Sequence, residues 1–227
     1  MVENAKSISE VTSLLQKSIT PLGRREEISL CSANGRICAE HIYSPLSLPT
    51  SNNAAVDGFA FHYEWSTSHP NHVYDIVAEI RAGHPYSGKL LPGQAVAIFT
   101  GAIVPEELNC IVMQENCILE EKKRVRIPFA PKKGLNIRMA GENLRKGEVI
   151  IKDGQRITAA DVGQLSAIGR SKIFCYSELS IGVLSTGDEV MDASNTKAFL
   201  RPGQLYDTNR PMLKAMITKD NHFCSCL

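Results

Sequence analysis

The spacing of apolar residues divides the chain into stretches of different predicted structure. Near the N-terminus apolar side chains recur at helical spacing behind a capping box of Ser7 and Glu10, which predicts an amphipathic helix that ends at Pro21 and docks on other parts of the protein. From about residue 50 to residue 140 short apolar runs alternate with turn residues, and no long helical pattern occurs. This stretch is predicted to be a compact β domain, with strands at 95–99 and 109–113.

Helical and strand patterns mix on both sides of that predicted β domain. Before it, residues 26–30 favour a short strand and residues 32–39 a short helical turn. After it, Thr158 and Asp161 predict a capped helix that runs to Ile168. We therefore expect a small α+β domain built from segments that are distant in the sequence.

The last part of the chain has the pattern of a parallel α/β domain. Residues 179–184 are almost continuously apolar, as strands of parallel sheets are, and residues 211–219 carry an apolar helical stripe. A strand and a helix are the first unit of a doubly wound sheet, which needs further strands to cover both faces. Residues 221–227 supply at most one short second strand, so we expect this domain to be incomplete.

Composition excludes several classes of protein. The chain has 227 residues, 43% of them hydrophobic and 22% charged, and a net charge of +1, as expected for a globular protein of more than one domain. This balance predicts neither a nucleic-acid partner nor an anionic membrane partner, so any anion site must be local. There is no apolar leader and no run of membrane-spanning length, which makes the cytoplasm the expected location.

Cysteine usage favours thiols over disulfides. The seven cysteines include no Cys-x-x-Cys pair, and five lie in apolar contexts that suit buried, reduced side chains. Those five are Cys31, Cys38, Cys110, Cys117 and Cys175. The six histidines show no helical spacing of metal ligands, so we expect them to be packing or surface residues.

Four polar segments, each next to a glycine and each at the end of a strand-like run, carry the candidate chemistry. They are 53–60 with Asp57, 100–101 with Thr100, 136–143 with Arg138, and 185–189 with Asp188 and Glu189. Carboxylates, hydroxyls and an arginine in such positions favour a site for an anionic ligand and a divalent cation.

Simpler interpretations stay open for each segment. Asp57 with Gly58 also suits an ordinary turn, although its apolar flanks indicate a half-buried carboxylate that needs a cation or a donor. Thr100 equally suits a hydroxyl that ends a strand. Arg138 is either an anion contact or one half of a surface salt bridge with Glu142. Asp188 and Glu189 could also cap the segment that follows them, and Asp188 suits that role better than Glu189.

In this order the four segments resemble the molybdopterin molybdotransferase family, which includes bacterial MoeA and the E domain of gephyrin. The resemblance runs from about residue 7 to about residue 219. The family pattern Gly-Glu-Asp is replaced here by Gly141-Glu142-Asn143, and the family's later Ser-Gly-Gly-Val-Ser motif is not found. The chain is therefore identified as a C-terminally truncated member.

The resemblance implies a mixed α/β multidomain fold with an inserted β domain, a small α+β linker domain and the start of a doubly wound, molybdopterin-binding-like α/β domain. The implied divisions are 1–22 for the N-terminal helix, 23–48 with 141–176 for the discontinuous linker and dimerisation domain, 49–140 for the inserted β domain, and 177–227 for the truncated α/β domain.

The resemblance also implies an activity: insertion of molybdate into adenylylated molybdopterin with release of AMP, assisted by Mg²⁺. The implied assembly is a homodimer whose cleft combines the inserted domain of one subunit with the α/β domain of the other. Because the chain is expected to lack half of the site that binds the pterin, we expect its activity to be impaired. A non-catalytic dimeric scaffold or an inactive remnant are the alternatives.

Site roles follow from the same resemblance. Asp57 and Glu189 are expected to order Mg²⁺ or molybdate, with Thr100 as the third catalytic residue through an oxyanion contact. The expected substrate-binding residues are Arg138, Asp188, Asp207 and Asn209.

Overall fold

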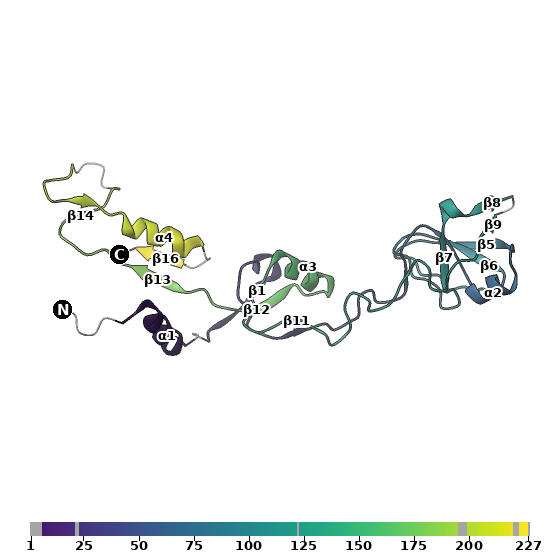
Figure 1. The fold of residues 1–227 in the computed structure, drawn as a ribbon, viewed down its shortest axis with the longest axis horizontal. Helices are drawn as coiled ribbons and strands as arrows, with labels where there is room; N and C mark the ends of the chain where they lie inside the picture. The colour runs from purple at the N-terminus through teal and green to yellow at the C-terminus, as the bar shows by residue number, and fades with distance from the viewer. Residues whose placement is uncertain (1–5, 21–22, 122, 195–198, 220–222, 227) are drawn as a thin grey trace. The chain divides into compact units, whose positions relative to one another are not determined.

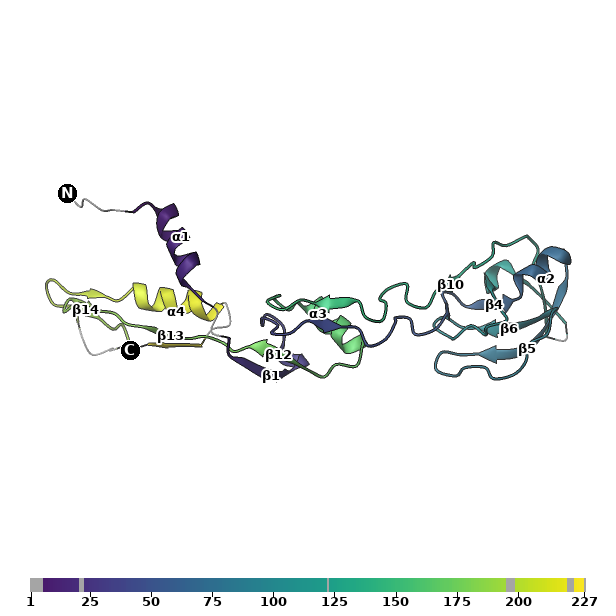
Figure 2. The same ribbon diagram turned by 90° about the horizontal axis from the view of Figure 1, so that it is seen from below.

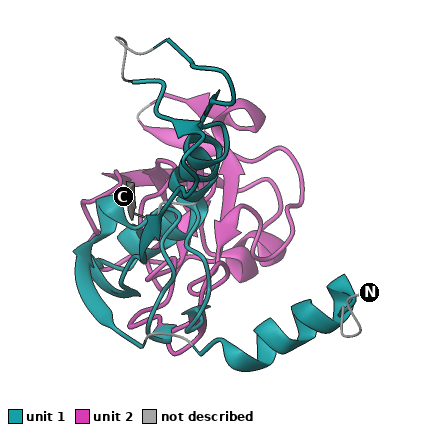
Figure 3. Cartoon of the chain, turned by 90° about the vertical axis from the view of Figure 1, so that its left-hand side faces the viewer, with its two compact units in different colours: residues 1–42, 150–227 teal, residues 43–149 magenta. Residues whose placement is uncertain are grey.

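The computed structural model describes residues 6–20, 23–121, 123–194, 199–219 and 223–226. The chain divides into two compact units, which Figure 3 colours separately. Unit 1 contains residues 1–42 and 150–227, and unit 2 contains residues 43–149. Strand β2 (Ile42–Tyr43) pairs with β11 (Val149–Ile151). Unit 2 is therefore an insertion within the sequence of unit 1.

A six-stranded sheet organises unit 2, with the strand order β7-β4-β6-β5-β9-β8. Neighbouring strands are antiparallel except β5 and β6, which are parallel and are joined by residues 81–93. The strands of the sheet are β4 (Gly58–Phe61), β5 (Val73–Ile80), β6 (Gln94–Ile98), β7 (Cys110–Met113), β8 (Ile118–Glu120) and β9 (Arg124–Arg126). The remaining elements of the unit are β3 (Asn53–Ala54), α2 (Tyr63–Ser68), the 3-10 turn η2 (Gln114–Asn116) and β10 (Ile137–Arg138).

Both faces of this sheet are covered. All four residues of β4 are buried, and its side chains alternate between two apolar clusters. Ala60 belongs to the cluster that contains Ile98 and Ile111, whereas Phe59 and Phe61 belong to the other cluster. The period-two alternation of a strand thus builds two cores from one short segment.

The sequence-based expectations for unit 2 hold in outline. Strands lie at the two predicted positions, as β6 and β7, and β8 pairs antiparallel with β9. The one α-helix described in this unit, α2, has six residues. The prediction of short strands without a long helix is therefore confirmed.

Unit 1 contains an antiparallel pair of β1 (Arg25–Ser29) and β12 (Lys172–Tyr176) next to α3 (Ala159–Ala167), as Figures 1 and 2 show. The predicted N-terminal cap is present and is a capping box: Thr158 accepts a hydrogen bond from the backbone of Asp161, whose carboxylate accepts from the backbone of Thr158. Leu165 is the buried residue of this helix. The pairing brings together sequence segments on opposite sides of unit 2.

The helical turn predicted at 32–39 is wrong. A 3-10 turn, η1, is present earlier, at Leu30–Ser32, and Ile37 and Cys38 instead form β-bridges to Arg156 and Cys175. Cys38 and Ala39 are buried by this pairing, so long-range strand contacts override the local helical preference.

The N-terminal helix α1 (Ile8–Ser18) has the predicted capping box of Ser7 and Glu10. None of its residues is buried, and Leu15 is 53% exposed. That this helix docks through its apolar stripe stays a prediction.

The C-terminal part of unit 1 contains the expected first unit of a parallel α/β fold. Strand β13 (Ser180–Val183) leads through a loop to α4 (Asn209–Lys219), and β13 then pairs in parallel with β16 (Phe223–Cys226), which lies beside it in Figure 1. A second parallel pair joins β14 (Val190–Met191) and β15 (Leu205–Tyr206). The single short second strand that the sequence allows is thus present.

Strand β13 is less covered than its apolar sequence predicts. Its residues alternate between exposed and intermediate, and Leu184, which follows it, is 66% exposed.

Within the part of the chain that the structure describes, no helix is both long enough and apolar enough to cross a membrane.

Candidate functional site

Two predicted site residues of unit 2 are in direct contact. Oδ1 of Asp57 accepts a hydrogen bond from the backbone N–H of Thr100 at 2.8 Å and another from its hydroxyl at 2.7 Å. These bonds lower the pKa of Asp57, the backbone N–H having the larger effect. Asp57 is exposed, which corrects the expectation that its apolar flanks half-bury it. The contact therefore holds an ionised carboxylate in a fixed orientation at the surface.

Strand β3 brings the third polar segment to the same region. Ala54 exchanges backbone bonds with the segment next to Thr100: its N–H donates to Ala102 (2.9 Å), and its carbonyl accepts from Gly101 (2.8 Å). On the other side β3 pairs with β10, where Asn53 lies opposite Arg138. Three segments that are far apart in the sequence thus meet around a strand of two residues.

Gly58 serves the sheet and not a ligand. A Cβ atom built on Gly58 would lie 2.1 Å from the carbonyl oxygen of Val112, on the neighbouring strand β7. A glycine beside a polar segment can let a ligand approach the backbone, but at Gly58 strand β7 already occupies that space.

Arg138 forms the ion pair with Glu142 that is the simpler interpretation of this arginine. Its Nε donates to Glu142 Oε1 at 2.7 Å, and an Nη atom donates to Asn143 Oδ1 at 3.1 Å. The bond from Arg138 also lowers the pKa of Glu142. The Arg138 side chain is 44% exposed, so the pair contributes little to stability but fixes the direction of the guanidinium.

Asn143 takes part in that arrangement although it replaces the acidic residue of the family pattern. Its side-chain oxygen accepts from Arg138 without adding a negative charge. Arg138 is therefore neutralised by a single carboxylate, that of Glu142.

A second polar cluster lies at the carboxyl end of β13 in unit 1. Asp207, with a side chain 6% exposed, accepts a hydrogen bond from the Ser185 hydroxyl at 2.5 Å and one from the backbone N–H of Arg210 at 3.0 Å. The Ser185 bond is the largest cause of the lowered pKa of Asp207, and the charge of Arg210 adds to it. Arg210 also pairs with Asp192. The cluster connects the loop after β13 to the start of α4.

Asp188 and Glu189 lie in that same loop and are exposed. The backbone carbonyl of Glu189 accepts from Leu205 at 2.9 Å, which connects their segment to β15. Gly187 adopts a φ of +131°, and a Cβ there would lie 2.6 Å from Glu189 Oε2, so the carboxylate lies over the glycine. Asn209 is the first residue of α4, two positions after Asp207.

The seven predicted site residues thus form two groups. Asp57, Thr100 and Arg138 belong to unit 2. Asp188, Glu189, Asp207 and Asn209 belong to unit 1. Among the described residues no cluster of three or more His, Cys, Asp or Glu side chains has the arrangement of a metal site.

Sequence reasoning missed Ser185, Arg210 and Asn52. Asn52 accepts from the backbone of Ala140 at 2.9 Å and so connects β3 to the loop that carries Glu142. Ser185 was visible as the first residue of its polar segment, but its bond to Asp207 spans 22 residues. For Arg210 the local signal was its position three residues after Asp207, near the start of a helix.

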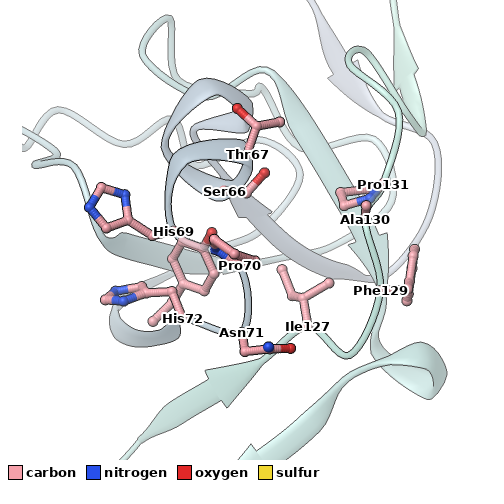
Figure 4. A pocket seen from close by; sticks show the side chains of 11 residues that line it. Ser66, Thr67, His69, Pro70, Asn71, His72, Ile127, Phe129, Ala130 and Pro131 are labelled. Carbon is pink, nitrogen blue, oxygen red and sulfur yellow. The ribbon is translucent and has the colours of Figure 1, made fainter.

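A pocket of about 140 Å³ lies in unit 2 away from these residues (Figure 4). It lies between α2 with the following turn and the segment 127–131. None of the seven predicted site residues lines it. Its lining combines two histidines with prolines and apolar groups: Ser66, Thr67, His69, Pro70, Asn71, His72, Tyr74, Ile127, Phe129, Ala130 and Pro131.

Known proteins similar to this chain agree on one family. The chain is 36% identical over 194 residues to a molybdopterin molybdenumtransferase of Haemophilus influenzae, a match that covers 86% of this chain and 47% of the relative. It is 34% identical over 198 residues to the enzyme of that name from a Nostoc species, covering 86% and 44%. The chain thus spans about half the length of the curated relatives it matches.

Solved structures give the same result. The crystal structure of a molybdopterin biosynthesis MoeA protein from Pyrococcus horikoshii matches with a TM-score of 0.83 and 27% identity, over 98% of this chain and 56% of that one. The family model described as the MoeA N-terminal region (domain I and II) matches residues 6–169, which is more than half of the chain. The protein therefore belongs to the MoeA family, the family of molybdopterin molybdenumtransferases.

Proposed function

We propose that this chain acts in molybdenum cofactor biosynthesis as a transferase that inserts molybdate into adenylylated molybdopterin with release of AMP. The observation that carries the proposal is the contact of Asp57 with Thr100, which holds an exposed carboxylate ionised and oriented. Family membership supplies the substrates. The relatives with this activity are about twice as long as the chain, so activity, substrates and partners are all part of the proposal.

The carboxylate of Asp57 suits magnesium. Mg²⁺ prefers oxygen ligands and is commonly held by one or two carboxylates together with water and substrate oxygens. Both bonds from Thr100 reach Oδ1, and Oδ2 of Asp57 has no partner among the residues that the structure describes. Asp57 would hold the ion with this oxygen, and Glu189 would supply the second carboxylate. Bound magnesium would neutralise phosphate and molybdate oxygens as negative charge develops on them.

The chain's own residues have separate tasks in this proposal. Thr100 orients Asp57 with its backbone N–H and its hydroxyl, and its contact with an oxyanion would require the hydroxyl proton to turn from Asp57 to the anion. Arg138 binds a phosphate or molybdate oxygen with the donors that Glu142 and Asn143 leave open. Asp188, Asp207 and Asn209 line the substrate side formed by the loop after β13 and the start of α4.

The assembly and location are proposed on the same basis. We propose a cytoplasmic homodimer in which unit 2 of one subunit faces the α/β segment of the other, so that Asp57 and Glu189 act in one cleft. The four-part division at 1–22, 23–48 with 141–176, 49–140 and 177–227 is proposed as the domain organisation.

Turnover of adenylylated molybdopterin tests the proposal. AMP release is measured with molybdate and Mg²⁺ for the unmodified chain and for Asp57→Asn, Thr100→Val and Glu189→Gln. Each carboxylate change is expected to lower the rate by roughly 100-fold or more. Asp75→Asn, which changes an exposed carboxylate of β5, is the matched control and should keep the rate.

The expectation that the 227-residue chain turns over little by itself stays a prediction. If turnover is too slow to compare variants, calorimetric binding of adenylylated molybdopterin in Mg²⁺ replaces it. Equal binding by the unmodified chain and Asp57→Asn would contradict the assignment of Asp57. A chain that dimerises but neither binds nor turns over the nucleotide would favour the non-catalytic scaffold.

A further inference from the structure

Two buried thiols lie opposite each other in unit 1. Cys38 and Cys175 are antiparallel bridge partners, and each is 0% exposed. Both are free cysteines. Cys38 precedes unit 2 in the sequence and Cys175 follows it, in β12. By contrast Cys31, which the sequence predicts to be buried, is exposed.

The register of this pairing suits a covalent bond. The backbone bonds that flank the pair run from Ala39 N to Phe174 O (2.9 Å) and from Tyr176 N to Ile37 O (2.8 Å). The two cysteines therefore form a non-hydrogen-bonded pair, in which the Cα atoms lie about 4.5 Å apart and the side chains leave the same face of the sheet. A disulfide requires Cα atoms roughly 4.4–6.8 Å apart. The backbone already satisfies that requirement.

The surroundings of the thiols keep them protonated. Cys38 Sγ donates weakly to the carbonyl oxygens of Glu40 (3.3 Å) and Phe174 (3.7 Å), the latter being the residue before Cys175. Burial raises the pKa of Cys38, and burial followed by the charge of Cys38 raises the pKa of Cys175 to about 11. Because the thiolate is the reactive form, the pair should stay reduced in air at neutral pH and react only with an added oxidant.

We propose that Cys38 and Cys175 form a reversible disulfide when a peroxide oxidises the protein. One thiol loses its proton and the resulting thiolate attacks the peroxide, whose O–O bond breaks; this gives a sulfenic acid and a hydroxide that takes up the released proton as water. The second sulfur then attacks the sulfenic sulfur, the S–O bond breaks, and a second water leaves with the remaining thiol proton. Two thiols thus lose two electrons and one hydrogen peroxide is reduced.

This bond closes a loop that contains the whole of unit 2. Closing a long loop lowers the conformational entropy of the unfolded chain and so stabilises the folded state. We expect the thermal midpoint of unit 1 to rise by roughly 5–10 °C on oxidation and to return on addition of dithiothreitol.

Peptide mapping of the purified chain tests the proposal directly. After treatment with hydrogen peroxide, free thiols are blocked with N-ethylmaleimide in denaturant and the chain is digested with trypsin. The expected product is a crosslink between the peptides of Cys38 and Cys175, lighter by two hydrogen atoms than the reduced pair. The proposal is overturned if both cysteines carry maleimide while exposed Cys31 is oxidised, or if either is bonded to another cysteine or another chain.

Variants separate this bond from other effects of oxidation. Cys38→Ala and Cys175→Ala should each lose the rise in midpoint. Cys110→Ala is the matched control, because Cys110 is also 0% exposed and burial raises its pKa to about 12, yet its register partner is Phe61. The inference is refuted if oxidation raises the thermal midpoint of Cys38→Ala as much as that of the unmodified chain. If the alanine variants do not fold, peptide mapping of the unmodified chain decides alone.

Discussion

Gly58→Ala should destabilise unit 2 although it adds one methyl group. The new Cβ would lie 2.1 Å from the Val112 carbonyl oxygen and 2.8 Å from its carbonyl carbon. Real Cβ contacts essentially never fall below 3.0 Å, so β4 and β7 must separate by about an ångström. Both strands contribute buried residues to the two apolar clusters, so such a shift disturbs packing on two faces of the sheet.

The expected cost is about 3 kcal/mol, the upper part of the usual range for overpacking a core, because the atom in the way is backbone and cannot rotate aside. This corresponds to roughly a 100-fold fall in the ratio of folded to unfolded unit 2. Gly163→Ala is the matched control. Gly163 lies within α3 with no atom near its would-be Cβ, so the same substitution should stabilise that helix by about 1 kcal/mol.

Hydrogen exchange with mass spectrometry measures both effects in one chain, since peptides from β4, β7 and α3 report on local opening separately. Gly58→Ala should accelerate exchange in β4 and β7 and leave α3 unchanged, whereas Gly163→Ala should slow exchange in α3. If Gly58→Ala left exchange unchanged and weakened only ligand binding, the glycine would serve a ligand after all.

Three further results follow from the structure. Thr158→Ala removes a helix cap and should cost about 1 kcal/mol, seen as faster exchange in α3; unchanged exchange would contradict the role of the cap. Thr100→Val removes one of two bonds to Asp57 and should raise its pKa part of the way to the ordinary value, as measured by carbon NMR of the carboxyl group; an unchanged pKa would contradict the contact. A hydrogen bond from Asn109 and, with a smaller effect, one from Lys133 lower the pKa of Glu64 to about 2, against 4.5 for an unperturbed group. Its stabilising effect is therefore complete above about pH 4.5 and lost as the pH falls towards 2, so urea midpoints of the unmodified chain and Glu64→Gln should converge in acid, and a constant difference would refute the linkage.

Local rules account for what the sequence predicted correctly. The cap of α3 was predictable because Thr158 and Asp161 lie within one turn, and the β domain was predictable from alternation over a few residues. The helical turn at 32–39 was not, because its conformation is decided by bridges to residues more than 100 positions later. The parallel pairing of β5 with β6 has the same origin, since no local pattern specifies which strands become neighbours.

The candidate site shows the same limit of sequence-based prediction, because its contacts join residues that are distant in the sequence. The residue types were visible in the sequence, but Asp57 and Thr100 are separated by 43 positions, and their contact exists only when β3 holds the segment 101–103 beside it. The lowered pKa of Asp57 is thus a property of folded unit 2 and not of the Asp-Gly motif. Any substitution that opens unit 2, Gly58→Ala included, must therefore also release the carboxylate from Thr100 and return its pKa towards the ordinary value. Stability of the sheet and the contact of Asp57 with Thr100 are coupled, because Asp57 directly precedes β4 and Thr100 follows β6.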